Sequence, residues 1–198
     1  MKYRSSILFL IFACFFSACS SVRSKKPVGE IVAELDPKIW NAKWADGEGP
    51  VFESRIKTPE LGMVEFTTLK AKEPDDLRSF EVIVRKVAGK TIASAKLGKE
   101  DFYDFGRIAI NEDHLIIFPP KPAKFSSLIN SHLLQGTLTQ DEKGIKTGSS
   151  IIDELTDHHI QLLEDRKERH FEDVSRFSDL FSDDPIYAYV RVKENAKK

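Results

Sequence analysis

Apolar and polar residues alternate with a period of two through most of the middle of the chain. This pattern predicts β-strands, because successive side chains of a strand point to opposite faces of the sheet. We expect strands at residues 51–57, 63–70, 79–87, 91–97, 102–110, 115–118 and 185–192. In the last of these, Ile186, Ala188, Val190 and Val192 share one face.

Short turn signals separate these strands and predict hairpins. Residues 58–62 (TPELG) join the first two strands, Gly89 and Lys90 join the third and fourth, and residues 111–114 (NEDH) join the next pair. Tight two-residue turns with glycine favour antiparallel neighbours. The pattern therefore predicts an antiparallel meander.

Two segments have a helical period instead. One begins at Pro122, places Phe125, Leu128, Ile129, His132 and Leu133 on one face, and is expected to end at Gly136 as its C-cap. The other is expected to begin after Thr156 as N-cap and to run toward Arg169. Residues 137–149 predict a loop or weak hairpin.

These elements predict a mainly β protein, in which the meander forms a small barrel or half-barrel with one or two helices toward the C-terminal half. A closed barrel removes the exposed edges that invite aggregation. The alternative is an α+β fold with an open curved sheet.

The N-terminus has a different pattern, in which Lys2 and Arg4 precede an apolar run over residues 7–18. Crossing a bilayer as a helix takes about 20 apolar residues, so this run is too short to span one. A charged start followed by a short apolar run and small residues is typical of a secretory signal peptide.

Residues 16–19 (FSAC) resemble the lipobox of bacterial lipoproteins, with Phe16 standing where that family usually has a smaller aliphatic residue. The resemblance implies cleavage between Ala18 and Cys19, and attachment of fatty acyl chains such as palmitate to Cys19. Cys14 also follows a small residue, but choosing it would leave a very short apolar run. We therefore assign the lipid to Cys19.

This assignment divides the chain into a signal peptide (residues 1–18), a lipid-anchored flexible tether (residues 19–30) and a single β-rich domain (residues 31–198). Ser20 and Ser21 follow the anchor, and the absence of aspartate at the second mature position is similar to Gram-negative lipoproteins sorted to the outer membrane. We expect a cell-envelope protein at the outer membrane, facing the periplasm.

Composition narrows the class of function. Removing residues 1–18 takes away Lys2 and Arg4, so the 30 basic residues become 28 against 31 acidic ones, a net charge near −3. That balance argues against nucleic acid as a partner, because nucleic-acid binding needs a basic face. No cysteine other than Cys19 remains in the mature chain, so it has no disulfide.

One further resemblance lies in the β-rich body. Trp44, near the start of the meander, and Arg191, in the last strand, are similar to the tryptophan and arginine that pack together in lipocalins. Ala42 stands where that family has glycine. The resemblance implies a structural pair and no ligand site.

Candidate chemistry is sparse. His158 and His159 are adjacent and point about 100° apart on a helix, while His170 would lie roughly 16 Å beyond His159, too far to share a zinc ion. Asp183 and Asp184 are typical of a turn before the last strand. Residues 148–150 (GSS) do not continue into the G-x-S-x-G frame of a nucleophile elbow. We therefore expect no catalytic residue, metal site or cofactor.

Two non-enzymatic functions remain open. The protein is expected either to bind a small apolar ligand inside the barrel or to act as a structural or assembly lipoprotein through contacts with another envelope protein. Aromatic residues in the predicted strands motivate the first, namely Phe52, Phe66, Phe80, Phe102, Tyr103 and Phe105. The predicted tether motivates the second.

Overall fold

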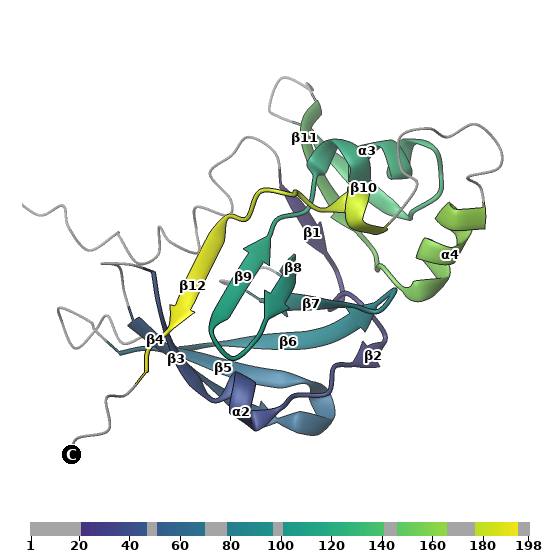
Figure 1. Ribbon diagram of the computed structural model, residues 1–198. Coiled ribbons are helices and arrows are strands. Elements are labelled where there is room, and N and C mark those ends of the chain that lie inside the picture. The colour runs from purple at the N-terminus through teal and green to yellow at the C-terminus, as the bar shows by residue number, and fades with distance from the viewer. Residues whose placement is uncertain are drawn as a thin grey trace, which may run out of the picture.

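The computed structural model describes residues 21–46, 51–69, 79–96, 101–140, 146–165 and 177–193. Eight of its strands close into an antiparallel barrel (Figure 1). They are β3 (Ala42–Ala45), β4 (Val51–Thr58), β5 (Met63–Thr68), β6 (Ser79–Val87), β7 (Lys90–Ala95), β8 (Tyr103–Ile110), β9 (His114–Phe118) and β12 (Tyr187–Arg191).

The barrel is an up-and-down meander with one interruption. Strands β3 to β9 pair in chain order, and β12 enters between β9 and β3 to close the ring. This arrangement confirms the predicted mainly β fold in its closed form, consistent with a lipocalin-like barrel. The chain between β9 and β12 leaves the barrel wall and returns to it.

That excursion builds a lobe on the outside of the barrel. It contains α3 (Pro122–Asn130), β10 (Gly136–Gln140), β11 (Lys146–Ile152), α4 (Asp157–Asp165) and the 3-10 turn η4 (Phe177–Leu180). The N-terminal strand β1 (Val22–Ser24) joins the lobe to the barrel, since it pairs in parallel with β11 and antiparallel with β8. Figure 1 shows the lobe beside the upper part of the barrel.

Short elements close the other end of the barrel. The helix α2 (Pro37–Trp40) begins at Asp36, whose side chain accepts a hydrogen bond from the Lys38 N–H, and it leads directly into β3. The strand β2 (Ile31–Val32) extends the pairing of β6, and the 3-10 turn η1 (Pro59–Leu61) joins β4 to β5.

The predicted hairpins form where the sequence supplies the turns. Ala88 and Gly89 have φ angles of +47° and +70° between β6 and β7, as a two-residue hairpin turn requires. Gly62 ends η1 with a φ of +66°, and a Cβ placed there would lie 2.3 Å from the Val84 carbonyl oxygen. Glycine is needed at Gly62 for both conformation and space.

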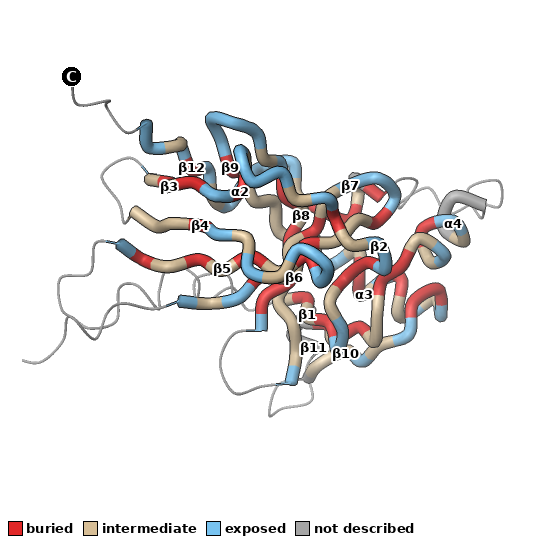
Figure 2. Tube along the Cα trace, turned by 90° about the horizontal axis from the view of Figure 1, so that it is seen from below, coloured by how far each residue is buried: buried red, intermediate tan, exposed pale blue. Residues whose placement is uncertain are grey.

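Two hydrophobic cores hold the molecule, and Figure 2 shows their buried segments. The barrel core lies inside the ring and is built around Trp44, Val64 and Val84. The lobe core is built around Phe125, Leu155 and Phe181, and it packs against outward side chains of the barrel wall, Ile92 and Phe105 among them. The outer face of β6 to β8 thus contributes Val87, Ile92 and Phe105 to the lobe core.

The structure corrects two expectations from the sequence and decides between the alternatives of a third. Residues 22–28 are not a flexible tether, because β1 is paired on both edges and Val28 is fully buried. Helix α3 ends at Asn130, with Ser131 as its C-cap, and Gly136 begins β10 instead of capping the helix. For residues 137–149 the structure confirms the hairpin alternative, in which β10 pairs antiparallel with β11.

Candidate functional site

Large aromatic side chains fill one side of the barrel interior. Phe80 stacks on Phe66 with ring centroids 5.5 Å apart, and Phe66 meets Phe52 edge-on at 6.2 Å. Phe52 in turn meets Tyr189 at 4.6 Å, and Tyr189 stacks on Tyr187 at 5.7 Å. These rings form a continuous series from β6 to β12, which lie on opposite sides of the ring of strands.

Small residues face this aromatic series. The inward positions of β7 are Ala93 and Ala95, both in contact with the barrel core. Large side chains on one wall opposite small ones on the other are how small barrels fill their interiors. Burial of Tyr189 also raises the pKa of its phenol well above the usual range, as expected in an apolar interior.

The aromatic series is less deeply buried toward one end of the barrel. Phe52, Phe80 and Tyr187 are half-buried there, whereas Phe66 and Tyr189 below them are buried. Residues 47–50, 70–78 and 97–100 connect strands at this end and lie outside the described residues. Within the described part of the aromatic series, these three rings keep the most exposed surface.

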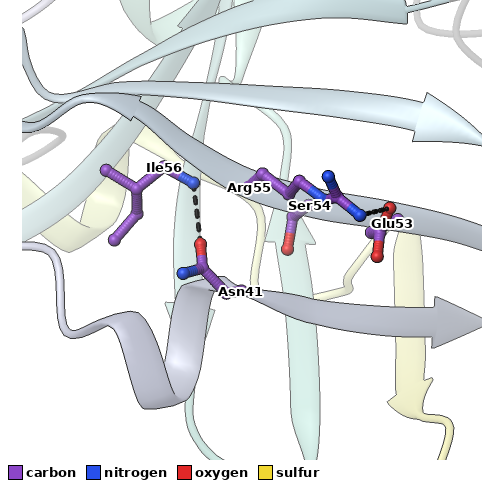
Figure 3. Close-up of a pocket in the computed structure, with 5 residues that line it drawn as sticks. All are labelled: Asn41, Glu53, Ser54, Arg55 and Ile56. Atoms are coloured by element: carbon purple, nitrogen blue, oxygen red, sulfur yellow. Dashed lines mark hydrogen bonds and ion pairs between the residues drawn. The ribbon is translucent and has the colours of Figure 1, made fainter.

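A small depression of about 210 Å³ lies between the end of α2 and β4 (Figure 3). The Asn41 side chain accepts a hydrogen bond from the Ile56 N–H at 2.8 Å, and Arg55 forms an ion pair with Glu53 at 2.9 Å. These contacts already use the polar groups at its rim. The depression offers no convergent set of groups for catalysis.

Ser54 lies beneath this depression and ties α2 to the barrel. Its fully buried hydroxyl accepts a hydrogen bond from the Trp44 indole N–H at 2.8 Å and donates one to the Trp40 carbonyl oxygen. Its role is therefore structural, and nothing in the sequence pattern distinguished it from other strand serines.

The predicted pair Trp44 and Arg191 is brought together in the sheet. The two residues are direct partners in the ladder between β3 and β12. The Arg191 guanidinium donates a hydrogen bond to the Glu112 carbonyl oxygen at 3.2 Å, while the Trp44 indole binds Ser54. The packing of the Trp44 indole against the Arg191 guanidinium stays a prediction.

The histidines are distributed over separate places. The His159 Nδ1 accepts a hydrogen bond from the Thr156 backbone N–H and lies 2.8 Å from the Thr156 hydroxyl, so the ring is held at the start of α4. His158 is exposed beside it, and His132 is exposed after α3 with a φ of +57° instead of lying on the apolar face of the helix. His170 lies outside the described residues.

The remaining polar candidates also have structural surroundings. Asp183 and Asp184 are exposed, and Asp183 lies 3.4 Å from the Lys121 ammonium. Ser150 is buried, with its hydroxyl 3.1 Å from that of Ser126. Among the described residues, no three His, Cys, Asp or Glu side chains are grouped so that they could hold a metal ion.

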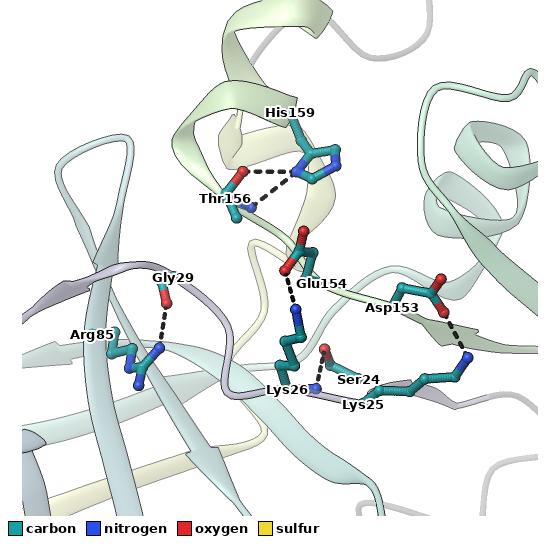
Figure 4. A network of polar contacts seen from close by, with 9 residues as sticks. All are labelled: Ser24, Lys25, Lys26, Gly29, Arg85, Asp153, Glu154, Thr156 and His159. Carbon is teal, nitrogen blue, oxygen red and sulfur yellow. Dashed lines mark hydrogen bonds and ion pairs between the residues drawn. The ribbon is translucent and has the colours of Figure 1, made fainter.

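A polar network fixes the N-terminal segment to the lobe (Figure 4). Lys25 pairs with Asp153 at 2.8 Å and Lys26 pairs with Glu154 at 2.9 Å. The hydrogen bond and charge of Lys26 lower the pKa of Glu154, and Glu154 raises the pKa of Lys26 in return. The network belongs to the fold and has no reactive group.

Exposed apolar residues lie on the outer side of β12 and at the residues directly before and after it. Ile186, Val190 and Val192 expose 38%, 53% and 38% of their surface, and the exposed Ala188 lies between them. We call these four residues the outer stripe. The sequence predicted that these four residues share one face, but it could not show whether that face is inside or outside the barrel. In the structure Tyr187 and Tyr189 lie inside the barrel, and the outer stripe faces outward.

Comparisons with protein-family models, curated proteins and solved structures found no match.

Ala18 and Cys19, the predicted cleavage and lipid-attachment residues, lie outside the described residues. None of the described helices has the length and apolar character needed to cross a bilayer.

Proposed function

We propose that the protein is a non-enzymatic lipoprotein of the cell envelope, anchored through acylated Cys19 at the outer membrane and facing the periplasm. It acts by binding another envelope protein through the outer stripe. The observation that carries this proposal is the row of exposed aliphatic side chains on the outer face of β12.

Such a row is unusual on a surface that meets only water. Single exposed apolar residues are common and need no explanation, but contiguous ones mark interaction sites. Ile31 and Leu61 are as exposed as Val190, yet they lie on separate short elements. The outer stripe repeats every second residue along one strand, so a partner can cover it with a single apolar ridge.

The barrel restricts how the partner binds. Each of its strands is paired on both sides, so a partner strand cannot be added to the ring. Recognition has to come from side chains that pack on the outer face. This favours a partner with a complementary apolar surface over an extended peptide.

Photo-crosslinking in living cells tests this proposal. A photoreactive amino acid at Val190 is expected to crosslink to one defined envelope protein, and Ile186→Asp in the same chain is expected to abolish that product. The matched control is the same photoreactive residue at Leu61, which is 55% exposed and lies outside the outer stripe. Equal products at Leu61 and Val190, or no product at Val190, would exclude the outer stripe as the binding surface.

A second candidate function is the binding of a small apolar ligand at the half-buried end of the aromatic series. The half-exposure of Phe52, Phe80 and Tyr187 favours it, whereas the packed rings and the β7 alanines below leave less room. Native mass spectrometry of the gently purified protein distinguishes the two. An added mass that is lost on denaturation supports a ligand, and the mass of the polypeptide alone supports a filled core.

A further inference from the structure

The folded body begins almost immediately after Cys19. The Ser21 carbonyl oxygen accepts a hydrogen bond from the Ser150 N–H at 2.7 Å. Val22 and Ser24 are buried, and Arg23 is a ladder partner of both Ile151 and Asp104. The backbone is therefore held in a sheet from Ser21 onward.

Only Ser20 separates Cys19 from this fixed point. Two trans peptide steps span at most about 7 Å, since each fully extended residue covers about 3.3–3.6 Å. A flexible tether of a dozen residues would let the body move freely above the membrane. A connection of a single residue does not allow such free movement.

The surface around Ser21 follows from the pairing of β8. One edge of β8 is shared, because Asp104 pairs with Arg23 of β1 while Arg107 pairs with Phe118 of β9. Only Phe105 and Gly106 separate the two positions along that edge. The start of β1 therefore lies beside the end of β9, where the chain enters α3.

We define the anchor face as Ser21 together with residues 119–124, which connect β9 to α3 and form its first turn. Ser126 of α3 lies against Ser150, the residue that binds Ser21, so α3 follows β11 at this end. Ala123 is exposed here between Lys121, whose ammonium also lies 3.4 Å from the Asp183 carboxylate, and Lys124. Lysine ammonium groups suit the phosphates of a phospholipid surface.

We propose that the anchor face rests directly on the phospholipid headgroups and that the short connection to Cys19 fixes one orientation of the body. This inference rests on the proposed lipid anchor. Helix α2 then lies at the end of the molecule away from the bilayer, as the opposite positions of α2 and α3 in Figure 1 indicate. The outer stripe lies on the barrel wall between these ends.

Lipid-headgroup quenching of a fluorescent label tests the orientation. The mature acylated protein carries a label at Ala123→Cys or, as matched control, at Lys38→Cys in α2; both positions are exposed. After acylation of Cys19 each variant has one free thiol. In vesicles of phosphatidylethanolamine, phosphatidylglycerol and a headgroup-nitroxide lipid, quenching is expected to be several-fold stronger at Ala123→Cys than at Lys38→Cys.

A spacer variant shows whether the short connection is the cause. Ten glycine and serine residues inserted between Ser20 and Ser21 span about 17–19 Å on average as a random coil. With this insertion, the difference between the two labelled positions should disappear. A difference that persists would show that surface affinity, and not the length of the connection, sets the orientation, and would overturn the inference.

The intact mass of each purified protein separates this inference from the proposed function. A chain without acyl groups would remove the anchor and the inference together. An acylated chain with equal quenching at Ala123→Cys and Lys38→Cys would overturn the fixed orientation while the lipid anchor stands.

Discussion

Replacing Ser54 by alanine should destabilise the protein far more than the loss of one surface hydroxyl would. The Ser54 hydroxyl is completely buried and serves two buried groups, the Trp44 indole N–H and the Trp40 carbonyl oxygen. Ser54→Ala leaves both without this partner. Each such group costs about 1–3 kcal/mol, so we expect a loss of about 3 kcal/mol in the free energy of unfolding.

Urea denaturation of the Cys19→Ser form, produced without residues 1–18, measures this loss, with tryptophan fluorescence and circular dichroism as independent probes. In a chain of this size the same loss lowers the melting temperature by about 6–12 °C, since 1 kcal/mol corresponds to about 2–4 °C. Ser79→Ala, at an exposed position in β6, is the matched control and should change stability by less than about 0.5 kcal/mol.

A double-mutant cycle with Trp44→Phe locates the effect. Phenylalanine removes the indole N–H, so Ser54→Ala in that background leaves only the Trp40 carbonyl without a partner, and its cost should fall by about 1–2 kcal/mol. If Ser54→Ala alone costs less than about 1 kcal/mol, the hydroxyl does not hold α2 to the barrel as the hydrogen bonds indicate.

Three further perturbations test other parts of the fold. Gly62→Ala should lower the free energy of unfolding by more than about 2 kcal/mol, because a strained φ and a backbone clash combine. Gly89→Ala has open space around it and should lower it by only about 1–2 kcal/mol, for its positive φ alone. Thermal unfolding of the two variants compares these losses. Burial raises the pKa of Tyr189, so above about pH 10 the unfolded chain loses the phenolic proton while the folded chain keeps it. The free energy of unfolding is therefore expected to fall as the pH rises above about 10. Tyr189→Phe should remove this loss of stability at alkaline pH. Lys26→Met should raise the pKa of Glu154 toward its usual value in an NMR titration, and an unchanged pKa would show that the ion pair does not form in solution.

The barrel could be predicted because its signals are local. Strand alternation sets the faces of residues 79–87, and Gly89 supplies the positive φ that its hairpin requires. Each hairpin pairs neighbours in the chain, so pattern and turn together determine the register. Closure by β12 could not be predicted in this way, because the same strands also fitted a half-barrel or an open curved sheet, and the pairing of β12 with β9 and β3 decides it.

The lobe and the candidate site could not be predicted in the same way. Strand β1 has only three residues and pairs with Ile151 and Asp104, far away in the chain, so no local period reveals it. Ser54 has no motif around it. The alternation of β12 fits burial of either face, and only the closed ring shows that Val190 points outward.

The position of β1 determines how the body would respond to mechanical load. A pull applied at Ser21 acts along the axis of β1, whose neighbours β8 and β11 hold it on both sides. Backbone hydrogen bonds run across the strands, so such a pull shears several of them at once and does not open them one by one. The proposed N-terminal attachment would therefore pull where the fold resists extraction, and force would pass through β8 to the barrel and through β11 to the lobe.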